Sequence, residues 1–406
     1  MTPSRLVVVG SSLAGLRAAE AARRNGFTGT VTMIGAEDHL PYDKPPLSKA
    51  FLDADDRPTP VYRDRESLAE LGIDLVLGEP ATGLDTEVRS VQVGVREIPY
   101  DALVIATGAR ARSLPALEGH AGVHTLRTLD DAVAVRSAVS DGAHAVVIGA
   151  GFIGSEVASS ARGRGLATTV VEASDTPLAR AIGEEMGAVC ARLHPAHGTA
   201  LRTGVTAVGA EGDGRVERVV LSDGSTVDAD LVVVGVGAVP DTDWLADSGV
   251  TADDGVLADA TLATGVPGVY AAGDAVRWHN DLFDETMRLE NWTSAAEQGA
   301  LAARNALDPA AATPYSTVPY FWSDWYGVRI QFAGVARADE VVVVDGDVDA
   351  HRFVALYRRG DRLVGALTLA RPTEIMKYRA LIARRADWAE ALEFAAARAE
   401  AAAARC

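Results

Sequence analysis

The chain has 406 residues, of which 48% are hydrophobic and 23% are charged. This length exceeds what one hydrophobic core can organise, so two or three domains are expected, and the composition is that of a folded globular protein rather than a disordered one. The formal net charge of −18 argues against unaided binding to nucleic acid or anionic lipid, because affinity for phosphates depends on clustered Lys and Arg side chains.

The chain begins with a predicted βαβ unit. Residues 1–5 show no secretory-signal pattern and lead into a strand at 6–9, a glycine-rich turn, a helix at 16–25 and a second strand at 31–34. In such a turn the first glycine permits a tight bend, the second lets backbone approach a pyrophosphate, and the third lets helix and strand pack closely. Ser12 stands where the second glycine is expected.

A carboxylate at the end of the second strand of a βαβ unit usually binds the ribose of the nucleotide. In this first unit Gly35 falls at that position, and Glu37 is displaced from it by two residues. Glu37 is therefore a candidate ribose ligand, and a solvated loop acid is the alternative. Further on, a strand at 102–105 ends in Ala106, Thr107 and Gly108, which suits a chain crossing between two nucleotide domains but also an ordinary loop.

A second βαβ unit repeats the first pattern in complete form. A strand at 145–148 leads into Gly149, Gly151 and Gly154, and a helix at 155–164 and a strand at 168–171 follow. Two such turns, each at a strand-to-helix junction, are much stronger evidence of dinucleotide binding than one. Glu172 ends the second strand, so NADH is favoured over NADPH, whose 2′-phosphate it would repel. The nearby Arg162 and Arg164 leave this preference open.

The chain then returns to elements like those of its first part. A strand at 231–234 ends in a small-residue turn that includes Gly237, and a strand from 269 delivers Asp274 to a glycine turn. Asp274 can bond the polyol chain of a flavin or cap a helix. Ser294 and Glu297 have capping-box spacing, which predicts a helix over 294–307. The alanine-rich end, 386–406, predicts a last helix with Glu and Arg on its exposed side.

These features, together with L-P-Y-D-K-P-P-L-S-K at 40–49, E-N-W at 290–292 and P-Y-F-W-S-D at 319–324, resemble the oxygenase-coupled ferredoxin reductases. These flavoproteins serve bacterial cytochrome P450s and ring-hydroxylating dioxygenases. The resemblance implies an α/β fold with two Rossmann-like, glutathione-reductase-like domains and a C-terminal α/β domain. It places FAD binding in residues 1–115 and 240–319, NAD binding in 116–239 and the C-terminal domain in 320–406.

The resemblance also assigns roles to single residues. The FAD site would consist of Gly10, Ser12, Ala14, Gly15, Glu37, Lys44, Pro45, Lys49, Ala106, Thr107, Gly108, Asp274, Trp292 and Trp322. The NAD site would consist of Gly149, Gly151, Phe152, Ile153, Gly154, Glu156, Glu172 and Gly237. Lys49 would lie near the reactive edge of the flavin and pair with Glu156, so these two residues are the catalytic candidates. No metal site is expected.

The activity implied is hydride transfer from NADH to FAD, followed by transfer of single electrons to an iron–sulfur ferredoxin. Since such ferredoxins are generally acidic, a local basic face is expected, with Arg288, Arg304 and Arg329 as candidates. Dense aromatics such as those at 320–326 are more often core than cofactor wall. Trp325 stands where relatives commonly have glutamine, and one hypothesis is that it alters the face seen by the electron acceptor.

Two other activities fit parts of the pattern. Disulfide reductases with similar nucleotide folds use a cysteine pair, and NADH oxidases and peroxidases use a single cysteine beside the flavin. Cys190 and Cys406 are the only cysteines and lie far apart, which supports neither of these nor a disulfide framework or cysteine metal site. A flavin-binding, NADH-responsive signalling protein resembling apoptosis-inducing factor remains the alternative. No apolar run approaches the roughly 20 residues of a membrane span, so a soluble, cytoplasmic protein is expected.

Overall fold

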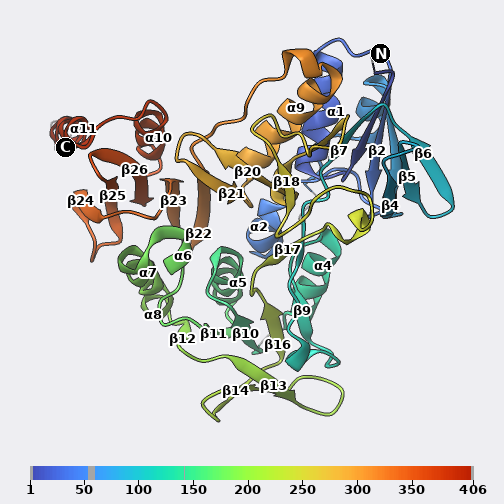
Figure 1. Ribbon diagram of the computed structural model, residues 1–406. Helices are drawn as coiled ribbons and strands as arrows, with labels where there is room; N and C mark the ends of the chain where they lie inside the picture. Colours follow the sequence, from blue (N-terminus) through green and yellow to red (C-terminus); the bar gives the residue numbers. More distant parts are fainter. Residues whose placement is uncertain (1–2, 54–59, 141, 404–406) are drawn as a thin grey trace. The chain divides into compact units, whose positions relative to one another are not determined.

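The computed structural model describes residues 3–53, 60–140 and 142–403. Contacts between residues divide the chain into two compact units, each assembled from three separate stretches (Figure 1). Unit 1 comprises Met1–Asp43, Thr59–Arg110 and Val239–Pro319. Unit 2 comprises Lys44–Pro58, Ala111–Ala238 and Tyr320–Cys406. The short strands β8 (Ala109–Ala111) and β17 (Ala238–Pro240) lie where the chain passes from one unit to the other.

Unit 1 is built on a five-stranded parallel sheet in the order β19-β7-β1-β2-β3. Its central strands are almost wholly apolar and buried, as expected for a parallel sheet covered on both faces. Helices α1 and α9 pack side by side (Figure 1). The bounds are β1 Arg5–Val9, α1 Leu13–Arg24, β2 Thr30–Gly35, β3 Ile73–Leu77, β7 Ala102–Ile105, β19 Val269–Ala271 and α9 Trp292–Leu307.

Smaller elements complete unit 1. Two three-stranded sheets have the orders β4-β5-β6 and β18-β20-β21, and one short helix precedes β3. Their bounds are α3 Arg65–Glu70, β4 Ala81–Asp85, β5 Ser90–Val93, β6 Arg96–Pro99, β18 Val256–Ala258, β20 Val276–Asn280 and β21 Glu285–Arg288.

Unit 2 contains a second five-stranded parallel sheet, in the order β12-β11-β10-β16-β9, with an antiparallel β13-β14-β15 sheet beside it. The sheets consist of β9 Val123–Thr125, β10 His144–Ile148, β11 Ala167–Val171, β12 Ala200–Arg202, β13 Ala207–Glu211, β14 Arg218–Leu221, β15 Thr226–Asp228 and β16 Leu231–Val234. The helices are α2 Ala50–Asp53, α4 Leu129–Ala138, α5 Phe152–Gly163, α6 Ala179–Ile182, α7 Glu184–Ala191 and α8 Leu193–Ala196.

The end of the chain adds an antiparallel sheet and two helices to unit 2. The sheet has the order β22-β23-β26-β25-β24 and is followed by α10 and α11 (Figure 1). The bounds are β22 Tyr320–Trp325, β23 Val328–Gly334, β24 Glu340–Asp347, β25 Arg352–Arg359, β26 Arg362–Leu369, α10 Ile375–Ala383 and α11 Trp388–Ala403. The predicted α/β class, with two Rossmann-like sheets and a C-terminal domain, is confirmed.

Three helix starts differ from the predictions. Helices α1 and α5 begin three residues earlier than expected, because Ser12 and Gly151 are already the N-cap residues. The third glycine of each turn therefore lies in the first helical turn. Helix α9 begins at Trp292, with Asn291 as N-cap, so the capping box predicted at Ser294 and Glu297 is wrong. Among the residues that the structure describes, no helix is long and apolar enough to cross a membrane.

Glu374 joins the last two helices. It accepts hydrogen bonds from Arg398 of α11 at 2.8 Å and from Lys377 of α10 at 2.8 Å. The Arg398 hydrogen bond, with that of Lys377, lowers the pKa of Glu374 to about 2. Since the folded pKa lies below the unfolded value, this pairing stabilises the fold above about pH 4.5 and loses its effect as the pH falls towards 2.

We therefore expect E374Q to lower the free energy of unfolding by about 1 kcal/mol at neutral pH and by much less near pH 3. Denaturant midpoints of wild type and variant at the two pH values measure this. E393Q, at an exposed acid of α11, is the matched control and should leave both midpoints unchanged. An equal loss for E374Q at both pH values would contradict the assignment.

Candidate functional site

The first glycine turn lies between β1 and α1 and is shaped by two close backbone contacts. Gly10 has φ +115°, and a Cβ on it would lie 2.0 Å from the carbonyl oxygen of Ala106. A Cβ on Gly15 would lie 1.8 Å from the carbonyl oxygen of Gly10. Both positions therefore exclude any side chain, and α1 starts close against the strand. Its first N–H groups remain free to receive a pyrophosphate.

The second turn, between β10 and α5, repeats this construction. Gly149 has φ +100°, and a Cβ on it would lie 2.4 Å from the carbonyl oxygen of Gly235. A Cβ on Gly154 would lie 2.1 Å from the carbonyl oxygen of Gly149. Gly151, in contrast, has no heavy atom within 4 Å of its Cβ position. That open side is where a cofactor's phosphates can approach the backbone, so this turn fits a dinucleotide.

The turns after β7 and β16 lie against the first glycine of each glycine turn. Because they make the same contact, their sequences are similar, A-T-G-A at 106–109 and G-V-G-A at 235–238. Ala106 and Gly235 provide the carbonyls that exclude the two Cβ atoms. Thr107 donates its hydroxyl to the carbonyl of Asp241 at 2.6 Å, and the Asp241 amide donates to Gly108 at 3.0 Å. Gly237 has φ +102° and accepts the Arg112 amide.

The displaced acid of the first unit has a steric cause. A Cβ on Gly35 would lie 2.1 Å from the hydroxyl oxygen of Ser11. No carboxylate can therefore stand at position 35 while Ser11 occupies that space. Glu37 lies two residues on, and its carboxylate accepts the Tyr42 hydroxyl at 2.5 Å. The sequence analysis missed Ser11, because no motif marks a residue whose effect depends on its contact with Gly35 in the fold.

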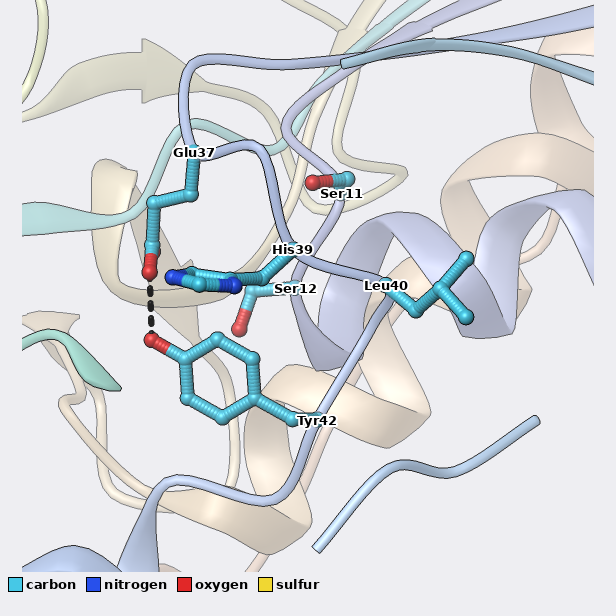
Figure 2. A pocket seen from close by; sticks show the side chains of 6 residues that line it. All are labelled: Ser11, Ser12, Glu37, His39, Leu40 and Tyr42. Atoms are coloured by element: carbon cyan, nitrogen blue, oxygen red, sulfur yellow. Dashed lines mark hydrogen bonds between the residues drawn. The ribbon is translucent and has the colours of Figure 1, made fainter. Parts of the chain in front are cut away.

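A small pocket lies beside this turn (Figure 2). Figure 2 shows the Glu37 side chain directed towards Tyr42, with His39 beside both. The rings of His39 and Tyr42 meet edge to face at 6.3 Å. Polar groups around a concave site are suited to a sugar's hydroxyls. The lining residues are Ser11, Ser12, Glu37, His39, Leu40 and Tyr42.

Asp274 and Trp292 lie near the same turn within unit 1. Asp274 belongs to a short 3₁₀ helix, η4 (Gly273–Ala275), and a Cβ on Gly273 would lie 3.0 Å from the Cβ of Ala14. Trp292 opens α9 and donates its indole N–H to Asp43 at 2.9 Å and to Tyr62 at 3.0 Å. Ala14, Asp274 and the first turn of α9 thus belong to one region of unit 1.

In unit 2, Glu172 is held against the second glycine turn. Its carboxylate accepts the backbone N–H of Ala150 at 2.7 Å and that of Ser174 at 2.8 Å. Arg162 and Arg164 lie at the C-terminal end of α5. Measured along the helix axis, this end is about 18 Å from the N-terminal end beside the glycine turn. They donate to the carbonyls of Leu166 and Leu52. Neither guanidinium therefore balances the charge of Glu172.

The catalytic candidates Lys49 and Glu156 form an ion pair in unit 2. The ammonium of Lys49 lies 2.8 Å from Oε2 of Glu156, whose side chain is 4% exposed. Ser48 donates its hydroxyl to the same oxygen at 2.5 Å. Ser323 donates to the other oxygen, Oε1. Sequence reasoning found the pair but missed both serines, although each lies within the quoted motifs at 40–49 and 319–324.

Other predicted residues of unit 2 surround this pair. Lys44 donates to the carbonyl of Arg127 at 3.3 Å, and Pro45 starts the 3₁₀ helix η1 (Pro45–Ser48) that precedes Lys49. Phe152, the first residue of α5, packs its ring at 4.4 Å from that of Phe321. Ile153, the next residue, is exposed.

The aromatic cluster at 320–326 separates into core and surface members. Trp325 is fully buried, so its side chain does not itself contact an electron acceptor, and an influence on the face that the acceptor sees stays a prediction. Trp322 is half-buried and stacks at 5.9 Å on Tyr320. Side chains alternate between the two faces of β22, which accounts for part of the difference in burial between Trp322 and Trp325. In addition, the ring of His194 lies 5.4 Å from that of Trp325 at the end of the strand.

The three candidate docking arginines already have partners. Arg288 is largely buried and pairs with Asp254 at 3.2 Å and Glu290 at 2.7 Å. Arg329 makes a bidentate pair with Asp324 at 2.8 and 2.9 Å. Arg304 donates to Thr313 at 2.6 Å. Among the described residues, Arg304 thus pairs with a hydroxyl rather than with an acid, and the role of all three in docking stays a prediction.

Cys190 is buried on α7, and burial raises the pKa of its thiol to about 12. A thiol in that state is a poor nucleophile. Cys406 lies outside the residues that the structure describes.

Comparison with known proteins identifies the family. Residues 4–299 match the model for pyridine nucleotide-disulphide oxidoreductases, and residues 320–399 match a reductase C-terminal domain. The chain belongs to the pyridine nucleotide-disulphide oxidoreductase family.

Its relatives include several reductases of oxygenase systems. The chain is 38% identical to rhodocoxin reductase of Rhodococcus erythropolis, over 93% of this chain and 89% of that protein. It is 36% identical to the biphenyl dioxygenase system ferredoxin–NAD(+) reductase component of Paraburkholderia xenovorans, over 91% and 90% of the two chains. The structure matches putidaredoxin reductase, solved in its covalent complex with putidaredoxin, with TM-score 0.90 at 30% identity, covering 98% of this chain and 99% of that one. The resemblance inferred from the sequence is confirmed.

The second glycine turn makes a sharp prediction. G154A should force α5 away from the strand and weaken NADH binding at least about tenfold, because its Cβ would meet the Gly149 carbonyl. G163A on the same helix is the matched control, since nothing lies within 4 Å of its Cβ position. That change should leave NADH affinity unchanged and stabilise the helix by about 0.5–1 kcal/mol. Equal NADH dissociation constants for the two variants would refute the steric argument.

Proposed function

We propose that this protein is an NADH-dependent ferredoxin reductase of a cytochrome P450 or ring-hydroxylating dioxygenase system. It takes hydride from NADH onto bound FAD and passes single electrons to an iron–sulfur ferredoxin. The similarity to reductases of oxygenase systems supports this activity. The observation that carries it in this chain is the pair of glycine turns, each closed to side chains where helix meets strand, in a sequence that has no C-x-x-C pair.

The residues present fit the two nucleotides. In unit 1 the Gly10 turn would hold the FAD pyrophosphate, Glu37 its adenosine ribose and Asp274 its ribitol. In unit 2 the Gly149 turn would hold the NADH pyrophosphate, and Glu172 would accept hydrogen bonds from the ribose diol. Residues 1–115 and 240–319 would then form the FAD domain, 116–239 the NAD domain and 320–406 the C-terminal domain.

Bound FAD supplies a group that accepts two electrons together and releases them one at a time. The protein's task is to position the reactants and provide the electrostatics. Lys49 would supply a positive charge beside the flavin, which would stabilise the negative charge that the flavin gains on reduction. Glu156 holds that ammonium group at 2.8 Å and is itself held by two serine hydroxyls. No general base is needed, because hydride transfer moves no separate proton.

Electron delivery requires an encounter with an acidic partner. The net charge of −18 opposes it, so docking depends on a local basic or apolar surface. Arg304 is the strongest of the three arginine candidates, since Arg288 and Arg329 are paired with acids. We place the reaction in the cytoplasm, where NADH is supplied.

Purified protein tests the proposal directly. It should contain FAD, bleach rapidly with NADH and reduce added ferredoxins in steady turnover. A colourless protein that takes up no FAD on reconstitution would refute the proposal. Slow formation of a stable charge-transfer complex without turnover would instead favour the NADH-responsive signalling protein.

Removal of the Lys49 charge should slow the flavin's reduction. We expect K49M to reduce the stopped-flow rate of bleaching by NADH about 100-fold, the usual cost of losing one preorganised electrostatic group. K49R keeps the charge and should retain much of the rate. Equal rates for K49M and wild type would remove Lys49 from the mechanism.

Glu172 should set the choice of nucleotide. E172Q keeps an acceptor but removes the charge that opposes a 2′-phosphate, so the preference for NADH over NADPH in kcat/KM should fall about tenfold. D175N, at an exposed acid nearby, is the control and should leave the ratio unchanged. A preference unaltered by E172Q would show that other groups discriminate.

A further inference from the structure

Ser323 and Trp325 lie beside the Lys49–Glu156 pair and are not explained by cofactor binding. We propose that they are positioning residues, which fix the carboxylate of Glu156 so that it holds the Lys49 ammonium in place. The inference concerns a hydrogen-bond chain from Trp325 through Ser323 to Glu156. Its catalytic meaning rests on the proposed function, whereas the existence of the chain does not.

The contacts on Glu156 account for both of its oxygens. Oε2 receives the Lys49 ammonium at 2.8 Å and the Ser48 hydroxyl at 2.5 Å. Oε1 receives the hydroxyl of Ser323. Lys49 and Ser48 are neighbours in the chain, so they hold one oxygen from one side. Ser323 is the contact that fixes the other oxygen and so prevents the carboxylate from turning about its own axis.

Trp325 determines which way the Ser323 hydroxyl points. Its indole N–H donates to the Ser323 oxygen at 2.8 Å. A serine hydroxyl can rotate and can either donate or accept, whereas an indole N–H can only donate. With the indole donating to its oxygen, Ser323 keeps its own hydrogen for Glu156.

Burial makes this chain strong. Ser323 and Trp325 are 0% exposed and Glu156 is 4% exposed, so water does not compete for these contacts. A buried polar group that loses its hydrogen-bond partner destabilises the fold, and the effect is larger when the group is charged. The His194 ring packs against Trp325, and burial lowers the pKa of His194 to about 4. It is therefore neutral near pH 7 and adds no cation that would draw Glu156 from Lys49.

The hydrogen-bond chain from Trp325 to Glu156 also connects distant parts of the sequence. Ser323 and Trp325 lie on β22, Glu156 lies on α5, and Lys49 follows η1. The two serines and the acid were brought together by the fold of unit 2. Strand β22 of the C-terminal sheet thereby takes part in placing the acid of the nucleotide-binding helix.

W325F tests the proposal, because it removes the N–H while keeping an aromatic ring. In the FAD-loaded protein we expect about tenfold slower bleaching by NADH, with S323A giving a similar loss. The double variant S323A/W325F should be no slower than S323A, since Trp325 acts through Ser323. W325Q, which restores a donor, should recover part of the rate.

W278F is the matched control. Trp278 is also 0% exposed but lies in unit 1, and its indole nitrogen has no hydrogen-bond partner among the residues that the structure describes. W278F removes the same side-chain volume as W325F, so it should lower stability but leave the bleaching rate unchanged. If W325F slows bleaching no more than W278F, or if the losses from S323A and W325F multiply, Trp325 serves only in packing and the proposal is overturned.

A structural readout separates this proposal from the function on which it rests. The indole ¹H–¹⁵N resonance of Trp325, assigned by its loss in W325F, should shift in S323A and also in E156Q, which lies two hydrogen bonds away. No shift in E156Q would refute the chain itself. If NADH fails to bleach wild-type protein while the shift is present, the proposed function fails and the hydrogen-bond chain stands.

Discussion

The structure of each nucleotide-binding unit depends on one close approach between a helix and the strand before it. In both glycine turns the carbonyl of the first glycine lies about 2 Å from where the third glycine would carry a Cβ. Any side chain there would move the helix from the sheet. The same tightness leaves the N–H groups of the first helical turn at the place where we propose that a pyrophosphate binds. Close packing of helix on strand and the proposed binding of phosphate therefore both require glycine at these positions.

A second constraint operates in unit 2, where a buried carboxylate must have hydrogen-bond donors or a positive charge beside it. Removing Glu156 from water is costly unless donors surround it, and the protein supplies an ammonium and two hydroxyls from three separate stretches of chain. The arrangement ties the segment around Lys49 and the C-terminal strand β22 to helix α5. The pair that we propose stabilises charge during hydride transfer is thus placed by contacts that no single motif contains.

The chain carries the frame of a family named for disulfide chemistry but lacks the thiols for it. With Cys190 buried, the electrons that a disulfide reductase would send to its cysteine pair need another exit, and a ferredoxin provides a one-electron acceptor. Docking of that partner has to overcome a net charge of −18. Because Arg288 and Arg329 are paired with neighbouring acids, they add little net positive charge to a surface that could attract the ferredoxin.

The sequence by itself determined the fold class, the two βαβ units and the positions of the seven strands it predicted to within a residue, because glycine turns and apolar runs are local features with local causes. The Lys49–Glu156 candidates came from the family resemblance. It placed the starts of α1, α5 and α9 wrongly by two or three residues, since Ser12, Gly151 and Asn291 act as caps only in their folded setting. Only the tertiary structure decided that Ser11 excludes an acid at Gly35, that Trp325 is interior, and that Ser48 and Ser323 hold Glu156. These contacts join residues far apart in the chain or depend on side-chain volume, and no pattern of neighbouring residues encodes such distances.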